Sequence, residues 1–198
     1  MPTGQILVGR KGGFDICNND GTITKSIDVE IRYGSEKLDI ISIQYHETDI
    51  YTLGIEPDQN AMRYFVMLKS EDYSKEGEWA LGYDKKVCHM AVVNNKVYLS
   101  DPENKQLLVY SLTGSEITNI KLSTFINPLQ LCLSGPNSII ISDGKANKVH
   151  KLDGNSDTIT WTCTDVKDPS AVCCDAHGDV WVWSRDTQSI FLLASDSG

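Results

Sequence analysis

Short apolar runs alternate with polar turns along the whole chain, and five of these runs share one pattern. Each consists of four to six β-prone residues, and a polar turn and a second apolar run follow it. The apolar parts begin 44, 47, 42 and 41 residues apart, at Ile6, Ile50, Val97, Ile139 and Val180. A repeat of this length with several short strands is typical of the blades of a β-propeller.

Turn dipeptides such as Asp20-Gly21 and Asp153-Gly154 separate further strands, as in antiparallel meanders. No window has helical periodicity, so the sequence predicts an all-β fold of eighteen strands, grouped as three, four, four, four and three. Five closed blades of four-stranded antiparallel sheet would need two more strands. We therefore expect four to five blades in an incomplete ring that self-associates through open blade edges. The predicted blades are residues 1–36, 37–86, 87–127, 128–168 and 169–198, and residues 69–77 are predicted to be an inserted surface loop.

Two blades carry a more specific motif, in which an apolar strand ends in Asp and is followed by Asn, a basic residue and another apolar strand. The motif comprises Asp101, Asn104 and Lys105 in one blade, and Asp143 and Asn147 with the basic residue after it in the next. It resembles the NHL repeats at the C-terminus of tripartite-motif proteins. The last blade matches partially, and the first two match by spacing alone. The resemblance implies a binding propeller. Any ubiquitin-ligase activity would belong to RING, B-box and coiled-coil segments, which this sequence does not contain.

The recurring Asp101 and Asp143 could be catalytic acids, but we interpret them as turn caps, completed by Asn104 and Asn147. A cap is needed in every blade, whereas a catalytic acid is needed once. The basic turn with Arg10 and Lys11 lacks the residues of a phosphate-binding loop. No metal-ligand spacing occurs among His46, His89, His150 and His177. We therefore expect no catalytic residue, metal or cofactor.

Cysteines and tryptophans occupy apolar runs. Seven residues before the first apolar residue of the last four repeats stand Ile43, Met90, Cys132 and Cys173, and we expect this position to lie in the core. The six cysteines are predicted to be reduced, buried thiols. Trp181 and Trp183 share one face of a strand and are expected to pack between blades; the alternative is an exposed aromatic binding platform.

The net charge and the lack of a recognisable targeting signal narrow the range of candidate functions. The net charge of −9 disfavours nucleic acid as the main partner. No apolar run reaches the length of a membrane span, and no signal peptide is recognisable, so we expect a cytoplasmic protein.

We predict a non-catalytic module that presents its inter-strand turns to a protein partner. The alternatives are an RNA-binding NHL propeller and a fragment of a propeller enzyme, such as a metal-dependent hydrolase or a lyase. Mixed charge on the turns suits a polar protein epitope. The candidate binding residues are Arg10, Lys11, Glu103, Lys105, Lys145 and Arg185.

Overall fold

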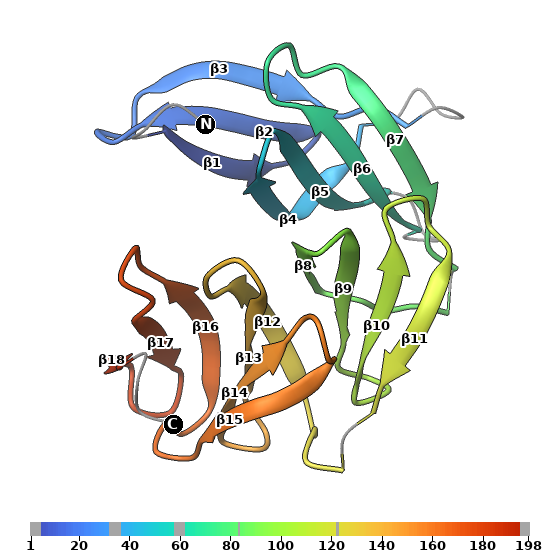
Figure 1. Cartoon of the computed structure of the whole chain (residues 1–198). Helices are drawn as coiled ribbons and strands as arrows, with labels where there is room; N and C mark the ends of the chain where they lie inside the picture. Colours follow the sequence, from blue (N-terminus) through green and yellow to red (C-terminus); the bar gives the residue numbers. More distant parts are fainter. Residues whose placement is uncertain (1–4, 32–36, 58–61, 83, 122, 195–198) are drawn as a thin grey trace. The chain divides into compact units, whose positions relative to one another are not determined.

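The structure is a computed structural model that describes residues 5–31, 37–57, 62–82, 84–121 and 123–194. The chain divides into two compact units, residues 1–85 and residues 86–198. The described residues form eighteen strands and no helix. The strands make five antiparallel sheets of three, four, four, four and three strands, in chain order (Figure 1). The predicted strand number and grouping are confirmed.

Unit 1 contains two of these sheets. The first comprises β1 (Gln5–Arg10), β2 (Gly13–Asn18) and β3 (Ile23–Asp28). The second comprises β4 (Asp39–His46), β5 (Asp49–Ile55), β6 (Arg63–Lys69) and β7 (Lys75–Ala80). Phe14 and Ile16 of the first sheet form one buried cluster with Ile50, Val66 and Leu68 of the second. The apolar faces of neighbouring sheets thus form the core of this unit.

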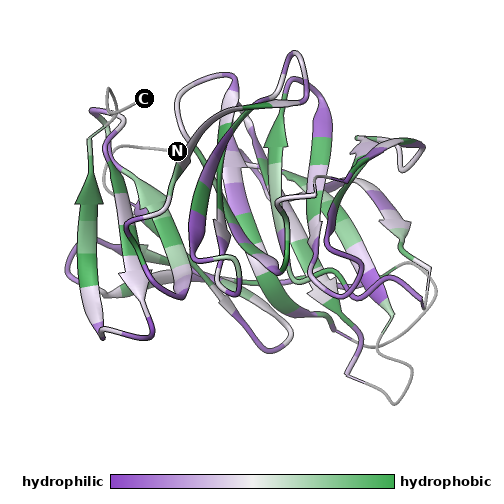
Figure 2. Cartoon of the chain, turned by 90° about the horizontal axis from the view of Figure 1, so that it is seen from below, coloured by the Kyte–Doolittle hydropathy of each residue, from purple (hydrophilic) through white to green (hydrophobic). Residues whose placement is uncertain are grey.

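Unit 2 contains the other three sheets. The first comprises β8 (His89–Val93), β9 (Lys96–Asp101), β10 (Gln106–Ser111) and β11 (Glu116–Ile120). The second comprises β12 (Pro128–Leu133), β13 (Ser138–Asp143), β14 (Lys148–Asp153) and β15 (Thr158–Cys163). The third comprises β16 (Pro169–Cys174), β17 (Val180–Ser184) and β18 (Ser189–Leu193). Ile139 and Ile141 pack with β8–β11, whereas Ile140 packs with β16–β18. Since successive side chains of a strand point to opposite faces, β13 is apolar on both. Figure 2 shows that apolar residues, in green, recur along the strands between more polar ones.

The predicted loop over residues 69–77 is shorter than expected. Residues 75–77 belong to β7, where Lys75 pairs with Leu68 and Gly77 with Met67. The polar residues Lys75 and Glu76 concealed the start of this strand, because an edge strand needs only half its side chains to be apolar.

The expected core position is also only partly correct. Met90 is buried, but Cys173 is exposed. The turn before β9 has two residues, since Val93 pairs with Lys96. The turn before β17 has three, since the N–H of Asp175 bonds the carbonyl of Asp179. Because the side chains of a strand alternate between its two faces, one extra residue in the turn places the residue seven positions earlier on the opposite face.

Candidate functional site

Asp101 ends β9, and its side chain organises the β9–β10 turn. Its Oδ1 accepts a hydrogen bond from the backbone N–H of Asn104 at 3.2 Å. Its Oδ2 accepts bonds from the side-chain amides of Asn104 and Gln106, each at 2.8 Å. The carboxyl group is fully buried. Its geometry is therefore that of an acceptor for donors within its own turn.

Asp143 ends β13 and accepts hydrogen bonds from two segments. The backbone N–H of Ala146, in the following turn, bonds Oδ1 at 3.1 Å. The backbone N–H groups of Ile126 and Asn127, just before β12, donate to its two oxygens at 2.8 Å each. One buried carboxylate thus positions both the turn and the chain entering the sheet.

The β17–β18 turn uses the hydroxyl group of Ser184 where the β9–β10 and β13–β14 turns use an aspartate carboxylate. The N–H of Thr187 bonds Oγ of Ser184 at 3.2 Å. All three turns end on a residue with positive φ: 56° at Lys105, 54° at Asn147 and 52° at Gln188. The turns therefore share one backbone conformation, although their sequences differ.

The exposed Asn147 side chain contacts the start of the next sheet, whereas Arg185 pairs within sheet β16–β18. The N–H of Asp168 donates to Asn147 Oδ1 at 2.8 Å, and Arg185 binds the Asp168 carboxylate through two bonds of 3.1 and 2.8 Å. A Cβ at Gly144 would lie 2.7 Å from Asp168 Oδ1 and 3.2 Å from the Pro169 carbonyl oxygen, so a larger residue there would displace the Asp168 side chain.

The remaining predicted binding residues fall into two groups. Arg10, in unit 1, pairs with Asp15 at 2.9 Å and with Asp28 at 2.8 Å, and hydrogen bonds to these carboxylates raise the pKa of its guanidinium. Glu103 pairs with Lys86 at 3.2 Å. The other three residues are exposed: Lys11, Lys105 and Lys145. The turns thus present mixed charge, part of which is already neutralised by internal pairs.

The most distinctive surface of unit 2 is the outer face of sheet β16–β18. Trp181 is 41% exposed, whereas Tyr98 and Ile140, at the equivalent positions of the two preceding sheets, are 0% exposed. On the same face, Trp183 is 37% exposed and Ile190 is 65% exposed. The expectation that the tryptophans pack in the core is therefore wrong in this structure. Tyr98 and Ile140 are each covered by the next sheet along the chain, and no described residue of unit 2 covers Trp181 in that way.

A cavity of about 290 Å³ lies on this face, between the side chains of its strands. Its walls are largely apolar and aromatic, and the residues that line it are Gln130, Ala171, Val172, Cys173, Trp181, Val182, Trp183 and Ile190. Such a combination of concavity and aromatic side chains is characteristic of binding surfaces rather than of ordinary solvent-exposed sheet.

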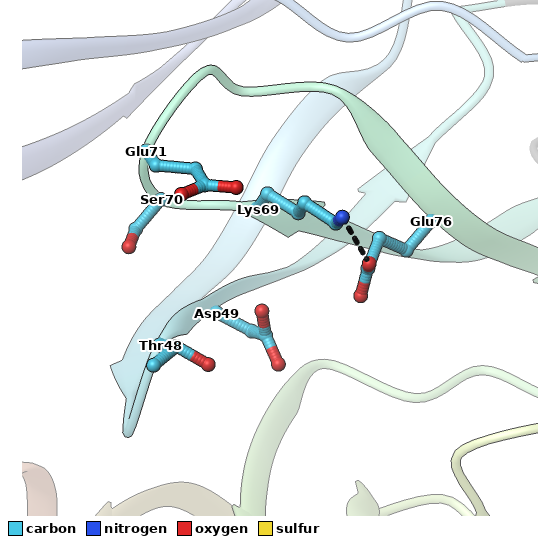
Figure 3. Close-up of a pocket in the computed structure, with 6 residues that line it drawn as sticks. All are labelled: Thr48, Asp49, Lys69, Ser70, Glu71 and Glu76. Carbon is cyan, nitrogen blue, oxygen red and sulfur yellow. Dashed lines mark ion pairs between the residues drawn. The ribbon is translucent and has the colours of Figure 1, made fainter.

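A second cavity, of about 390 Å³, lies in unit 1 and is polar (Figure 3). In Figure 3, Lys69 points toward Glu76, with which it makes a 3.2 Å ion pair. Asp49, on another wall, accepts a hydrogen bond from the Tyr51 hydroxyl at 3.5 Å; burial and this carboxylate raise the pKa of Tyr51 to about 12. The pair neutralises Glu76, so Asp49 and Glu71 leave the lining of this cavity with a net negative charge.

Two histidines are enclosed by the sheets of unit 2. Burial lowers the pKa of His89 to about 4, and its Nδ1 accepts a hydrogen bond from the N–H of Leu131 at 3.3 Å. Burial also lowers the pKa of His150, which contacts Thr162 and Phe125. Both rings are therefore neutral at pH 7 and are held as packing groups.

All six cysteines are free thiols, but only Cys17 is buried and Cys173 is exposed; the other four are half-buried. The prediction that all are buried is thus confirmed for Cys17, wrong for Cys173 and only partly correct for the rest. Cys132 and Cys174 lie in adjacent strands with their sulfur atoms 3.4 Å apart, a proximity that strand patterns alone do not reveal.

Within the described part of the chain, no three His, Cys, Asp or Glu side chains are grouped so that they could hold a metal ion. The same residues include no helix long and apolar enough to cross a bilayer.

The sequence matches no protein-family model and no curated protein. Solved structures do resemble it. A protein of unknown function from Bacteroides caccae has a TM-score of 0.70 at 10% identity, over 97% of this chain and 74% of that one. BamB from Moraxella catarrhalis has a TM-score of 0.63 at 12% identity, over 97% and 56%. A streptogramin B lyase has a TM-score of 0.60 at 11% identity, over 100% and 82%.

The five consecutive antiparallel sheets and these similarities identify the fold as an all-β propeller with five blades, the upper of the four to five predicted. At 10–12% identity the similarity concerns the fold, which supports many unrelated functions. The chain spans 56% of the length of BamB.

Proposed function

We propose that the chain is a non-catalytic, protein-binding propeller module whose main contact surface is the outer face of sheet β16–β18. The observation that carries this proposal is the exposure of Trp181, at 41%, where the equivalent Tyr98 and Ile140 are fully buried. Exposed tryptophans bordering a concave apolar surface are the side chains most enriched at protein interfaces.

The partner's chemistry follows from how equivalent faces are covered inside unit 2. Ile140 packs against a neighbouring sheet through Val172, Val180 and Val182. We therefore propose a protein partner that presents a β-sheet face of branched aliphatic side chains. Arg185, two residues beyond Trp183, together with Lys145 on the equivalent turn of the neighbouring sheet, would supply a polar rim. Arg10, Lys11, Glu103 and Lys105 remain predicted contacts of lower weight, since none of them lies on sheet β16–β18 or on the sheet that packs against it.

Two finer features belong to the same proposal. The blades are of the NHL type, on the strength of the Asp101–Asn104 and Asp143–Asn147 motifs, and the free thiols suit a cytoplasmic location. RNA binding is the second candidate implied by that resemblance; the exposed apolar face and the net charge of −9 favour protein.

Site-specific photo-crosslinking in cells tests the proposal. A benzoylphenylalanine at position 181 should yield discrete protein adducts, and these should disappear when Trp183→Lys and Ile190→Lys are added. A matched probe at Ile117, which is 50% exposed on β11 of the same unit, should give none. RNA adducts at the basic turns without protein adducts at position 181 would favour RNA binding, and the absence of both would contradict a binding role for this face.

A further inference from the structure

Two thiols meet where sheet β12–β15 packs against sheet β16–β18. Cys132 lies in β12 opposite Ile140, and Cys174 lies in β16 opposite Val180. Their sulfur atoms are 3.4 Å apart. A disulfide needs a separation of about 2.05 Å, so the two side chains together must approach by only about 1.3 Å.

The surroundings make the two thiols unequal. Cys174 receives hydrogen bonds from the thiol of Cys132 and from Ser134, and Lys151 adds positive potential, so the pKa of Cys174 is lowered. The hydrogen bond to Cys174 and burial raise the pKa of Cys132. Cys174 is therefore the better nucleophile, and Cys132 keeps its proton.

Each residue of the pair keeps some exposure to solvent. Cys132 and Cys174 are partly buried and pack against the apolar cluster of Val166, Val172 and Val182. The adjacent Cys173 is different, because it lies on the opposite face of β16 and is exposed beside the tryptophans.

We propose that Cys132 and Cys174 form an oxidation site that hydrogen peroxide converts to a disulfide between two blades. The Cys174 thiolate attacks one peroxide oxygen, the O–O bond breaks, and hydroxide leaves, which gives a sulfenic acid. This hydroxide takes up the proton that Cys174 released on ionising and becomes water. The Cys132 sulfur then attacks the Cys174 sulfur, the S–OH bond breaks, and the Cys132 proton leaves with this second hydroxide as water. Overall, the two thiols together lose two electrons, and these electrons reduce one peroxide to two waters.

The bond would connect positions 42 residues apart and would fix the last sheet to its neighbour. That last sheet carries the exposed tryptophan face. The inference stands independently of the proposed function, because it concerns thiol chemistry alone.

The test treats the purified, reduced chain with a small excess of peroxide. We expect a mass loss of about 2 Da, the loss of two hydrogens on disulfide formation. A digest without reductant should contain a Cys132–Cys174 peptide. The apparent Tm should rise by roughly 5–10 °C and return on reduction. Cys132→Ser and Cys174→Ser should each abolish both changes, whereas the matched control Cys173→Ser should preserve them.

A peptide joining Cys173 to Cys174 would overturn the proposal, as would Cys174 that gains oxygen atoms without cross-linking or a pair that stays reduced. The digest of the wild-type chain decides among these outcomes even if a serine variant does not fold.

Discussion

The hydroxyl of Ser142 donates a 3.1 Å hydrogen bond to the backbone carbonyl of Ser170, and so links β13 to the first strand of the next sheet. Ser100 makes the same link, at 2.7 Å, to the carbonyl of Leu129. Both acceptors directly follow the proline that begins their strand, Pro128 or Pro169. The Ser-Asp pair that ends a second strand therefore has two functions: the serine joins adjacent sheets, and the aspartate shapes the turn.

Replacing either linking serine should destabilise unit 2. In Ser100→Ala or Ser142→Ala, the carbonyl of a half-buried residue loses its hydroxyl donor, at a cost of about 1–3 kcal/mol. Denaturant unfolding would measure this loss of stability, with the dependence of the unfolding free energy on denaturant concentration unchanged. Ser156→Ala, at an exposed turn, is the control and should stay within about 0.5 kcal/mol. Equal effects in all three variants would mean that these bonds are not specific links.

The buried aspartates should behave as structural groups. Asp101→Ala or Asp143→Ala should lower the free energy of unfolding by roughly 0.5–2 kcal/mol, the range for loss of a side-chain cap. Asp143 should lie at the upper end, because three backbone N–H groups lose their acceptor. Calorimetric melting measures the change. Unchanged melting together with selective loss of a binding or catalytic activity would show that the carboxylate acts on a ligand.

Acid should destabilise the fold through His89. Its pKa is about 4 in the folded chain and about 6.5 when unfolded, so the unfolded state binds more protons between these values. Stability therefore rises with pH across this window, and His89 alone accounts for up to about 3 kcal/mol of loss at its lower end. Unfolding free energies at pH 4.5 and 7 measure the slope. His89→Gln should reduce this pH dependence. If the variant had the same slope as the wild-type chain, the result would contradict a buried, neutral His89 ring.

The exposed sheet faces should promote self-association. Ile6 and Val8 of β1 are 49% and 46% exposed, and they present the aliphatic chemistry proposed to cover Trp181. Light scattering should detect a concentration-dependent oligomer. Trp181→Lys should weaken it, whereas Ile117→Lys, on the outer strand β11, should not. A monomer across the whole concentration range would show that a second copy is not the occupant of this face.

The sequence by itself determined the strands and their repetition. Alternating apolar residues define a strand locally, and a repeat of 41–47 residues keeps the same positions facing the same neighbours. For that reason the eighteen strands, their grouping and the Asp101 and Asp143 turns follow from the pattern of residues along the chain.

Only the tertiary structure decided which apolar residues are covered. Trp181 and Ile140 have the same local pattern, but burial depends on whether another sheet lies above them, which is not a local property. The Cys132–Cys174 proximity likewise depends on two strands 42 residues apart. It also depends on turns of two or three residues, because a single added residue reverses the direction of every side chain that follows.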